Sequence, residues 1–415
     1  MITVIGLGFV GLTTALGFAA KNCRVYGYDN NREKLASIEA GEIPFYEPHL
    51  REVLCSTNQK FFFPTQEPDK AIKESKVVIF CVGTPCGDDG SADLSHLLSA
   101  IDETLGLMKK GDFKVLVIKS TVPPSTTKEI IRPFIEKRGF VIGKDVGLAN
   151  NPEFLREGYA WDDFINPDRI ILGVEDERSA AILTEIYRPF QAPLFTVSLS
   201  TGEFVKYLSN TLLATLISFS NEMSMVADAI GDIDVKSAFR ILHLDRRWSG
   251  DPASMTTYAY PGCGYGGYCL PKDTQALYAQ SSRHGFSPFI LKEVIQTNDK
   301  IKDFIVSKVE KQIGKDKTIG ILGLSFKPGS DDVRDTPAAA LIELLLKRGF
   351  SGIMAFDPLA LEQFQKAYAL PVTYASSLDE ICRKADALII ATGWDEFKDS
   401  SRFQGKPVFD YRYIL

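Results

Sequence analysis

The chain contains little histidine and few cysteines for its length. Its 415 residues include four histidines, which are widely separated, and seven cysteines that form no CxxC pair. Zinc sites use clustered cysteine and histidine ligands at short spacings, so we expect no metal centre. Cysteines without a disulfide pattern are typical of a reducing compartment, which favours free thiols.

Long apolar runs and clusters of one charge are also missing. The chain opens on the strand-like segment Ile2–Ile5 rather than on a charged segment and an apolar run, so no signal peptide is expected. The most apolar region, residues 204–220, is interrupted by Lys206 and Asn210, which a bilayer would penalise. The net charge of −6, with lysines and arginines scattered, gives no reason to expect a nucleic-acid partner. These absences predict a cytoplasmic protein with neither a membrane nor a nucleic-acid partner.

Strand-like and helical segments alternate in two parts of the chain, which is typical of βαβ crossovers and parallel sheets with helices on both faces. In the first part, the expected strands are Ile2–Ile5, Val25–Tyr28, Val77–Cys81, Val115–Ile118, Val146–Ala149 and Ile170–Val174. In the second part, they are Lys317–Leu322, Ile353–Phe356, Val372–Tyr374, Ala387–Ala391 and Val408–Phe409. We predict the α/β class, with two Rossmann-like doubly wound domains, residues 1–197 and 301–415, separated by a helical domain, residues 198–300.

A long helix is expected between the two α/β domains. The run Ser200–Glu203 has the pattern of a capping box, and the helix that it opens can extend to Gly231. This helix is apolar on most faces, so another helix or another subunit must cover it. We therefore expect it to connect the domains and to form part of a homodimer. The proline-rich segment Gly41–His49 is an insertion that is more typical of a site than of a fold.

A glycine-rich turn follows the first strand. Gly6, Gly8 and Gly11 form a GxGxxG pattern that opens a helix, whose N-terminus favours the phosphates of a dinucleotide. Asp29 ends the second strand, close to the usual spacing for an acid that binds the ribose hydroxyls, which favours NAD over NADP. Nearby Lys34 argues weakly the other way, because a cation could hold a 2′-phosphate. A turn needed only for packing is the alternative.

Two further segments end expected parallel strands, where ligands bind in open α/β sheets. They are Cys81–Pro85 and Lys119–Pro124, whose small and hydroxyl side chains leave room for a cofactor ring. Strand-end loops need turn residues in any case, so these segments alone decide little.

Two pairs of polar residues at a spacing of four are candidates for catalysis. Glu153 and Glu157 would share one face of a helical turn, where either could order a water or tune a base; a solvated turn is the alternative. Lys206 and Asn210 lie on the long apolar helix. A partly desolvated lysine there could act as a general base or, while protonated, stabilise an oxyanion; a polar stripe on a surface helix is the alternative.

Cys269 ends the glycine-rich run Gly262–Gly267 and is followed by Lys272 and Asp273. Such a loop can wrap a phosphate or a sugar, and a cation stabilises a nearby thiolate. A thiol beside a nicotinamide suggests attack on an aldehyde, followed by hydride loss to a thioester and hydrolysis by water. The other six cysteines are interpreted as small buried hydrophobes.

Together these motifs resemble the nucleotide-sugar 6-dehydrogenases of the UDP-glucose/GDP-mannose dehydrogenase family. The resemblance covers nearly the whole chain and includes Gly6–Gly11, Cys81–Pro85, Lys119–Pro124, Asn151–Gly158, Glu203–Asn210, Gly264–Asp273, Gly323–Lys327, Asp331–Arg334 and Asp410–Arg412. It implies oxidation of C6 of a sugar by two NAD⁺, as in conversion of UDP-glucose to UDP-glucuronate for polysaccharide biosynthesis. It also implies dimerisation through the long helix, NAD in the first domain and a nucleotide sugar in the third.

The resemblance assigns roles to particular residues. It implies that Cys269 is the nucleophile, that Lys206, Asp273 and Asn210 act beside it, that Glu153 assists the thioester step, and that Glu157 and Thr121 handle the hydrolytic water. Cofactor contacts are expected from Gly6, Gly8, Phe9, Val10, Gly11, Asp29, Lys34, Thr84, Pro85, Ser120, Thr121, Glu157, Lys272 and Arg334. Substrate contacts are expected from Glu153, Phe154, Leu155, Arg156, Glu157, Lys206, Asn210, Arg247, Tyr258, Tyr260, Gly262, Gly264, Tyr265, Gly266, Phe326, Lys327 and Arg412.

The run around Cys269, Gly-Gly-Tyr-Cys-Leu-Pro-Lys-Asp, is most similar to bacterial UDP-glucose 6-dehydrogenases. GDP-mannose and UDP-N-acetylhexosamine 6-dehydrogenases, a single-oxidation dehydrogenase and a non-catalytic nucleotide-sugar regulator are the alternatives. The segment Arg246–Thr257 is longer than in the family, where an arginine reaches the neighbouring subunit's sugar; Arg246 and Arg247 are both candidates. Ser125 stands where the family often has glycine.

Overall fold

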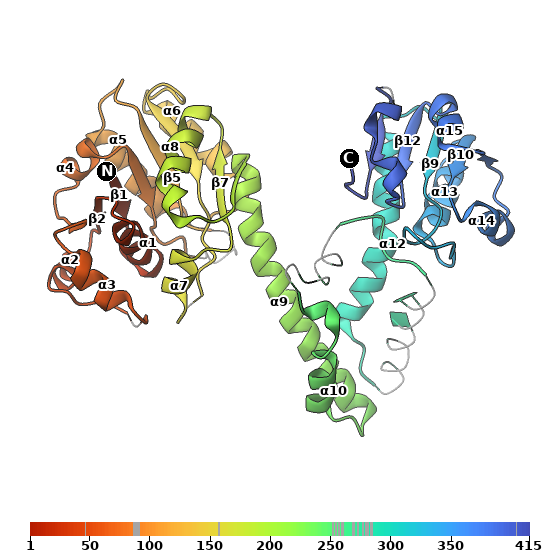
Figure 1. The fold of residues 1–415 in the computed structure, drawn as a ribbon, viewed down its shortest axis with the longest axis horizontal. Helices are drawn as coiled ribbons and strands as arrows, with labels where there is room; N and C mark the ends of the chain where they lie inside the picture. Colours follow the sequence, from red (N-terminus) through yellow and green to blue (C-terminus); the bar gives the residue numbers. More distant parts are fainter. Residues whose placement is uncertain are drawn as a thin grey trace. The chain divides into compact units, whose positions relative to one another are not determined.

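The computed structural model describes residues 1–45, 47–85, 92–156, 158–250, 253, 255, 258, 261–267, 270–271, 274–275, 278, 282, 285–403 and 405–415. They divide into two compact units, Met1–Thr215 and Leu216–Leu415, and each unit has its own α/β core (Figure 1). Among the described residues, no helix combines the length and the apolar character that a membrane span requires.

The first unit is built on an eight-stranded sheet with the order β3-β2-β1-β4-β5-β6-β7-β8. All neighbouring pairs are parallel except β6 and β7, which are antiparallel. The strands are β1 Ile2–Ile5, β2 Val25–Tyr28, β3 Phe62–Pro64, β4 Val77–Phe80, β5 Lys114–Ile118, β6 Val146–Asn150, β7 Ile170–Val174 and β8 Leu194–Val197.

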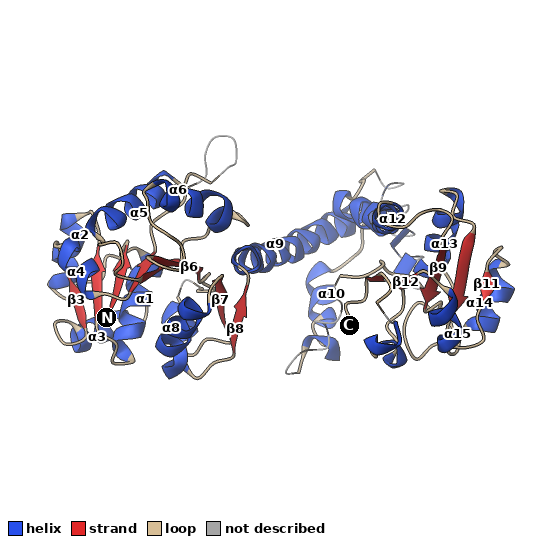
Figure 2. Cartoon of the chain, turned by 90° about the horizontal axis from the view of Figure 1, so that it is seen from above, coloured by secondary structure: helices blue, strands red, loops and turns tan. Residues whose placement is uncertain are grey.

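Helices cover both faces of this sheet. They are α1 Phe9–Ala20, α2 Arg32–Glu39, α3 Leu50–Thr57, α4 Pro68–Glu74, α5 Ser95–Leu107, the π-helical turn η1 Thr127–Ile131, α6 Arg132–Lys137, α7 Ala160–Ile165, α8 Glu177–Tyr187 and the 3₁₀ turn η2 Arg188–Phe190. Figure 2 shows α5 and α6 on one face and α1 and α8 on the other. This arrangement confirms the predicted doubly wound architecture.

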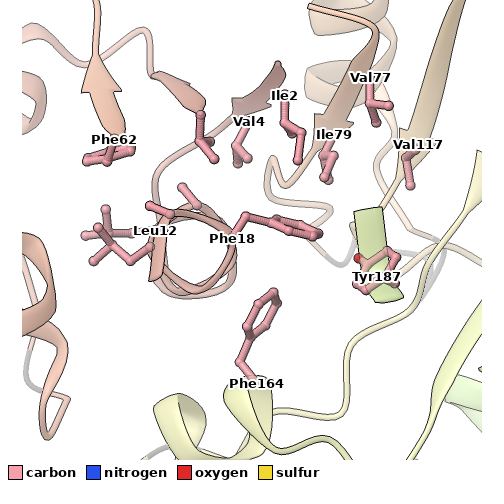
Figure 3. Packing of buried hydrophobic residues seen from close by; sticks show 14 of the residues in the cluster. Ile2, Val4, Leu12, Phe18, Phe62, Val77, Ile79, Val117, Phe164 and Tyr187 are labelled. Atoms are coloured by element: carbon pink, nitrogen blue, oxygen red, sulfur yellow. The ribbon is translucent and has the colours of Figure 1, made fainter. Parts of the chain in front are cut away.

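The strand side chains alternate between two apolar cores, one on each face of the sheet. Val77 and Ile79 of β4 pack toward α1 and α8, whereas Val78 and Phe80 pack toward α5 and α6. Figure 3 shows Phe18 of α1 between the strands and Phe164. The ring centroids of Phe18 and Phe164 are 5.8 Å apart. Strands buried on both faces read as nearly continuous apolar runs, which is why these central strands are recognisable from sequence.

The long helix α9, Leu199–Ile230, begins in the first unit and ends in the second. Its N-terminal hydrogen bond comes from Ser198, whose Oγ accepts the Thr201 N–H at 3.2 Å. The predicted capping box at Ser200–Glu203 is therefore wrong. Glu203 is buried, and its carboxylate accepts the Thr127 N–H at 2.8 Å instead of an amide at its own helix start.

The second unit contains a five-stranded parallel sheet with the order β11-β10-β9-β12-β13. Its strands are β9 Thr318–Leu322, β10 Gly352–Phe356, β11 Thr373–Tyr374, β12 Ala387–Ile390 and β13 Val408–Asp410. Its helices include α10 Val235–Leu242, α12 Phe289–Glu310, α13 Pro337–Lys347, α14 Leu361–Tyr368, α15 Leu378–Lys384 and the 3₁₀ turns η3 Arg246–Trp248, η5 Asp395–Phe397 and η6 Ser400–Phe403. Buried Glu222 joins α9 to α12 by accepting the Ile290 and Leu291 N–H groups at 2.7 and 2.9 Å.

Candidate functional site

The turn between β1 and α1 has the geometry of a dinucleotide-binding loop. Gly6 has a φ of +88°, and a Cβ there would meet the Cys81 carbonyl at 2.9 Å. A Cβ on Gly11 would lie 1.7 Å from the Gly6 oxygen, so the helix can approach the turn only without a side chain. At Gly8, by contrast, no described atom lies within 4 Å of an added Cβ, so this glycine opens space above the helix N-terminus. Such space admits a pyrophosphate.

Asp29 lies at the end of β2 and holds the same turn. Its Oδ2 accepts the Leu7 N–H at 2.8 Å and the Lys34 ammonium at 2.8 Å, and its Oδ1 accepts the Asn31 N–H at 2.9 Å. The carboxylate thus fixes the loop on which a dinucleotide would lie. Because Lys34 is paired with Asp29, it offers a weaker site for a 2′-phosphate than the sequence alone suggested.

The loops after β4 and β5 are tied together beside this turn. The Thr84 hydroxyl donates to the Thr121 carbonyl at 2.7 Å, and the Ser120 hydroxyl donates to the Val82 carbonyl at 2.6 Å. Ser125 has a φ of +72°, a backbone conformation that favours glycine. A glycine would adopt this conformation at position 125 with less strain than Ser125. With Gly8 and Asp29, these loops fit a bound NAD.

Lys206 and Glu153 form an ion pair in a pocket of about 660 Å³ beside the sheet. Lys206 Nζ lies 2.8 Å from Glu153 Oε1, and the side chains are 10% and 13% exposed. The pocket is also lined by Phe154, Leu155, Arg156 and Asn210, so the predicted substrate residues of the first unit lie together. Asn210 itself is exposed, whereas Lys206 is buried.

Glu153 does not lie on a helical turn, which corrects one detail of the sequence interpretation. Residues 151–156 form an irregular segment after β6, and Glu153 Oε2 accepts the Leu155 N–H at 2.7 Å within it. The expectation that Glu153 and Glu157 share one face of a helical turn is therefore wrong for Glu153. Arg156 in the same segment pairs with Asp163 at 2.6 Å.

A buried polar network beside the pocket was missed by the sequence analysis. Asn151 Oδ1 accepts the Lys119 ammonium at 2.7 Å and the Tyr187 hydroxyl at 2.5 Å. Burial lowers the pKa of Lys119, an effect that nearby Glu153 opposes. The network fixes both strand-end loops beneath Glu153. Asn151 is 32 residues from Lys119 and 36 residues from Tyr187 in the sequence, so only the fold brings these side chains together.

Glu47 was also missed, although the segment Gly41–His49 was expected to serve a site. Its buried carboxylate accepts the Gly158 N–H at 2.9 Å and the Ala160 N–H at 2.8 Å. These contacts hold the C-terminal flank of the segment that carries Glu153. The function of the insertion in the structure is therefore to clamp this segment.

In the second unit, the glycine-rich loop packs against α12 and the segment between β9 and α13. Gly264 and Gly267 have φ values of +96° and +82°, and a Cβ on Gly266 would lie 2.3 Å from the Asp335 carbonyl oxygen. The Gly267 N–H donates to the Arg334 carbonyl at 2.9 Å, and the Tyr265 N–H donates to Asn298 at 2.8 Å. The glycines thus serve close packing of the loop, in addition to any ligand approach.

Two other predicted substrate residues of the second unit, Phe326 and Arg412, lie beside this loop. A Cβ on Gly262 would meet Arg412 Nη1 at 2.9 Å, and a Cβ on Gly267 would meet the Phe326 ring at 3.2 Å. Lys327 is exposed and its ammonium lies 5.5 Å from the Phe326 ring centroid. Arg247 pairs with Asp245 and lies 5.7 Å from the exposed Tyr258 ring.

The described cysteines include both buried and exposed thiols. Cys263 is fully buried in the core of the second unit, and burial raises the pKa of its thiol to about 12. Burial also raises the pKa of Cys81 to about 12. Cys55 is exposed, so its interpretation as a buried hydrophobe is wrong. The predicted site residues Glu157, Tyr260, Cys269, Lys272 and Asp273 lie outside the described residues, and their roles stay predictions.

The second unit repeats the fingerprint of the first. Gly323 follows β9 with a φ of +90°, and its N–H donates to the Phe356 carbonyl at 2.8 Å, as the Gly6 N–H donates to Tyr28. Asp357 at the end of β10 accepts the Leu324 N–H at 2.7 Å, as Asp29 accepts Leu7. The features of both units define a dinucleotide-binding protein with a second Rossmann-like unit.

Comparison with known proteins places the chain within one family. Residues 1–191 match the NAD binding domain of the UDP-glucose/GDP-mannose dehydrogenase family, residues 200–300 match its central domain, and residues 320–415 match its UDP binding domain. The chain belongs to the UDP-glucose/GDP-mannose dehydrogenase family.

Relatives match over nearly the full length. A UDP-glucose 6-dehydrogenase from Rickettsia conorii is 37% identical over 429 residues, covering 100% of this chain and 95% of the relative, and one from Pseudomonas aeruginosa is 36% identical, covering 96% and 88%. A ternary complex of GDP-mannose dehydrogenase from Pseudomonas aeruginosa is 30% identical with a TM-score of 0.85, covering 98% of this chain and 95% of that one. A UDP-glucose dehydrogenase from Pyrobaculum islandicum is 35% identical with a TM-score of 0.57, covering 100% and 94%.

Proposed function

We propose that the protein is an NAD-dependent UDP-glucose 6-dehydrogenase that oxidises C6 twice, from alcohol to carboxylate. The observation that carries this proposal is the full-length identity of 37% to a UDP-glucose 6-dehydrogenase. The sequence around Cys269 supports it, because a thiol can hold the aldehyde covalently for a second oxidation.

The proposed reaction has four steps. When bound, NAD⁺ would supply the hydride acceptor for each of the two oxidations, with Gly8 and Asp29 in the loops that would hold it. In the first step, a base takes the C6 hydroxyl proton as the alcohol becomes an aldehyde. The Cys269 thiolate then adds to the aldehyde carbon, and the alkoxide takes up a proton to give a thiohemiacetal. This loses a proton and a hydride to become a thioester, and water releases the acid and the thiol.

Lys206 is the residue we assign to the reacting oxygen. Its ammonium is buried, and among the described residues its ion-pair partner is Glu153, which fixes Nζ at the wall of the pocket. In its neutral form it would accept the C6 hydroxyl proton, and in its charged form it would stabilise an oxyanion. Asn210 lines the same pocket. We assign Glu153 to the thioester step, and Thr121 and Glu157 to the hydrolytic water.

We propose that Phe326, Lys327 and Arg412 bind the nucleotide part of the substrate. Their support is their position around the glycine-rich loop and the match of residues 320–415 to a UDP binding domain. Arg334 is proposed to contact NAD, and Arg247 to contact the sugar.

GDP-mannose is the second candidate substrate, because the solved GDP-mannose dehydrogenase has a TM-score of 0.85 to this chain. The test is kcat/KM for UDP-glucose, GDP-mannose and the UDP-N-acetylhexosamines, measured by NADH formation. UDP-glucose should exceed each of the others by at least about 10-fold. A larger kcat/KM for GDP-mannose would mean that GDP-mannose is the substrate, while the proposed reaction would stay the same.

We also propose a homodimer through α9. Phe204, Leu208, Leu212 and Leu216 recur at a helical spacing and are between 42% and 52% exposed, which is unusual for large apolar side chains. We propose the domain division 1–197, 198–300 and 301–415 and a cytoplasmic location, since a reactive thiol suits a reducing compartment. Light scattering that gives the mass of one chain at micromolar concentration would reject the dimer.

A further inference from the structure

Glu203 carries a carboxylate that is only half satisfied. It is 3% exposed, and its Oε1 accepts both the N–H and the hydroxyl of Thr127, at 2.8 and 2.5 Å. Its Oε2 is buried and has no hydrogen-bond partner among the described residues. A buried carboxylate oxygen without a partner is costly, so a polar group that the protein itself does not supply is expected there.

A small cavity of about 10 Å³ lies beside this carboxylate. Its polar walls are Glu203, Lys206, Asn150, Ser120 and Thr121. That volume is about the size of one water, and the walls offer the two to four polar partners that a buried water needs. Glu203 and Lys206 are three residues apart on α9, so their side chains share one face of the helix.

The surroundings of Glu203 favour a carboxylate that holds a proton or binds a water. Burial raises the pKa of Glu203, and the charge of Glu129 adds to this rise. The Thr127 hydroxyl and N–H oppose it, as does the nearby Ser125 N–H, which makes no hydrogen bond to Oε2. Tyr207 faces the same carboxylate, and burial raises the pKa of its phenol.

Beyond the cavity lie the groups that interact with Lys206. They are the ion-pair partner Glu153 and the buried Lys119, whose pKa is lowered by burial and then by Lys206.

We propose that this cavity binds one water that donates a hydrogen bond to Glu203 Oε2 and accepts one from Lys206 Nζ, which makes Glu203 a positioning residue for Lys206. Glu153 then holds one N–H of Lys206 and the water holds a second. The third substituent position on Nζ then points at the reacting oxygen. It is a lone pair when the amine is neutral and an N–H when the amine is charged. The positioning role rests on the proposed function, whereas the water site does not.

A purely structural role would use Oε1 alone, as a cap for the turn at Thr127. Glu203→Gln separates the two roles. The amide keeps one oxygen that can accept from Thr127, but it places an NH₂ group in the cavity, which cannot accept a hydrogen bond from water. The matched control is Glu129→Gln, because that exposed carboxylate acts electrostatically on Glu203 but does not line the cavity.

The direct test is a crystal structure of the full chain at a resolution that shows ordered water. Density for one water within hydrogen-bond distance of both Glu203 Oε2 and Lys206 Nζ is expected. An empty cavity, or a water that contacts neither group, overturns the proposal. This result is independent of activity, so it still decides the water site if the wild type fails to oxidise UDP-glucose and the proposed function falls.

The kinetic test compares both variants with the wild type on UDP-glucose and NAD⁺. We expect Glu203→Gln to lower kcat by about 10-fold or more, with both KM values within 2-fold, because a misplaced catalytic group affects the chemical step. The pH profile of kcat should shift for Glu203→Gln and not for Glu129→Gln. A kcat within 2-fold of the wild type, or equal effects of the two variants, overturns the positioning role.

Discussion

Gly8 and Gly11 lie at the start of the same helix, yet the structure predicts that alanine affects a different property at each position. A Cβ at position 11 would lie 1.7 Å from the Gly6 carbonyl oxygen and 3.0 Å from Cys81 Cβ, so backbone has to move. A Cβ at position 8 meets no described atom within 4 Å, and Gly8 has φ −75° and ψ −165°, which alanine adopts. Gly11→Ala should therefore damage the fold, and Gly8→Ala the cofactor site.

The expected magnitudes follow from these contacts. Overpacking against fixed backbone costs about 3 kcal/mol or more, so Gly11→Ala should lower the melting temperature by at least about 6 °C, at about 2–4 °C per kcal/mol for a unit of this size. Gly8 is the N-cap of α1, where alanine is a poorer cap than glycine, so Gly8→Ala should cost about 1 kcal/mol or less and lower the melting temperature by at most about 4 °C. Its Cβ would occupy the space for the pyrophosphate, which should weaken NAD⁺ binding by at least about 10-fold, or about 1.4 kcal/mol.

The assay measures both quantities on the same preparations. Thermal unfolding without ligand gives the stability, and isothermal titration with NAD⁺ gives the affinity. The reasoning is refuted if Gly8→Ala binds NAD⁺ within 2-fold of the wild type. It is also refuted if both variants lose the same stability, because the contacts at the two positions would then not matter.

Four further changes test other parts of the account. Cys269→Ser should abolish acid formation while nucleotide-sugar binding by titration stays within about 3-fold; unchanged turnover would remove the covalent mechanism. Lys327→Ala should weaken UDP-glucose binding by about 10-fold and NAD⁺ binding by less than 2-fold; equal loss of both would misplace the role of the second unit. Glu47→Gln should lower kcat by about 10-fold because Gly158 and Ala160 lose a charged acceptor, whereas the exposed Glu42→Gln should not; indistinguishable variants would mean that the clamp is irrelevant. Burial raises the pKa of Glu203, so its contribution to stability is fully present below the unfolded pKa of about 4.5 and is lost as the pH rises through the folded pKa. The melting temperature of Glu203→Gln should therefore rise relative to that of the wild type between pH 4 and pH 8. A difference in melting temperature that stays constant with pH would contradict this.

The central strands could be predicted from sequence almost to the residue. β1, β2 and β7 have the expected bounds, because buried strands show as short, nearly continuous apolar runs. β3 and β8 were not predicted. They lie at the two edges of the sheet, where β3 has three residues and ends in proline, and β8 is half exposed. The reversal of β7 against β6 also leaves no local signal, because strand direction depends on the path of the whole chain.

The site could be predicted where a motif is continuous in sequence. The glycine fingerprint and Asp29 lie together as their spacing indicated. Lys206 and Glu153 belong to separate motifs, and only the family resemblance suggested that they would lie together. Contacts made across long separations could not be predicted. Thr127 and Glu203 are 76 residues apart, and this contact explains why the capping-box pattern was misleading. One missed residue did leave a signal: Asp357 follows a strand after Gly323 just as Asp29 follows one after Gly6, so the repeated pattern could have been recognised.

The central claim is that this protein removes four electrons from a single carbon. The most direct measurement supplies a limiting amount of UDP-glucose with excess NAD⁺ and counts NADH at completion, with the product identified by mass spectrometry. The account predicts two NADH for each UDP-glucose and a carboxylate at C6. One NADH for each sugar with a released aldehyde would contradict it.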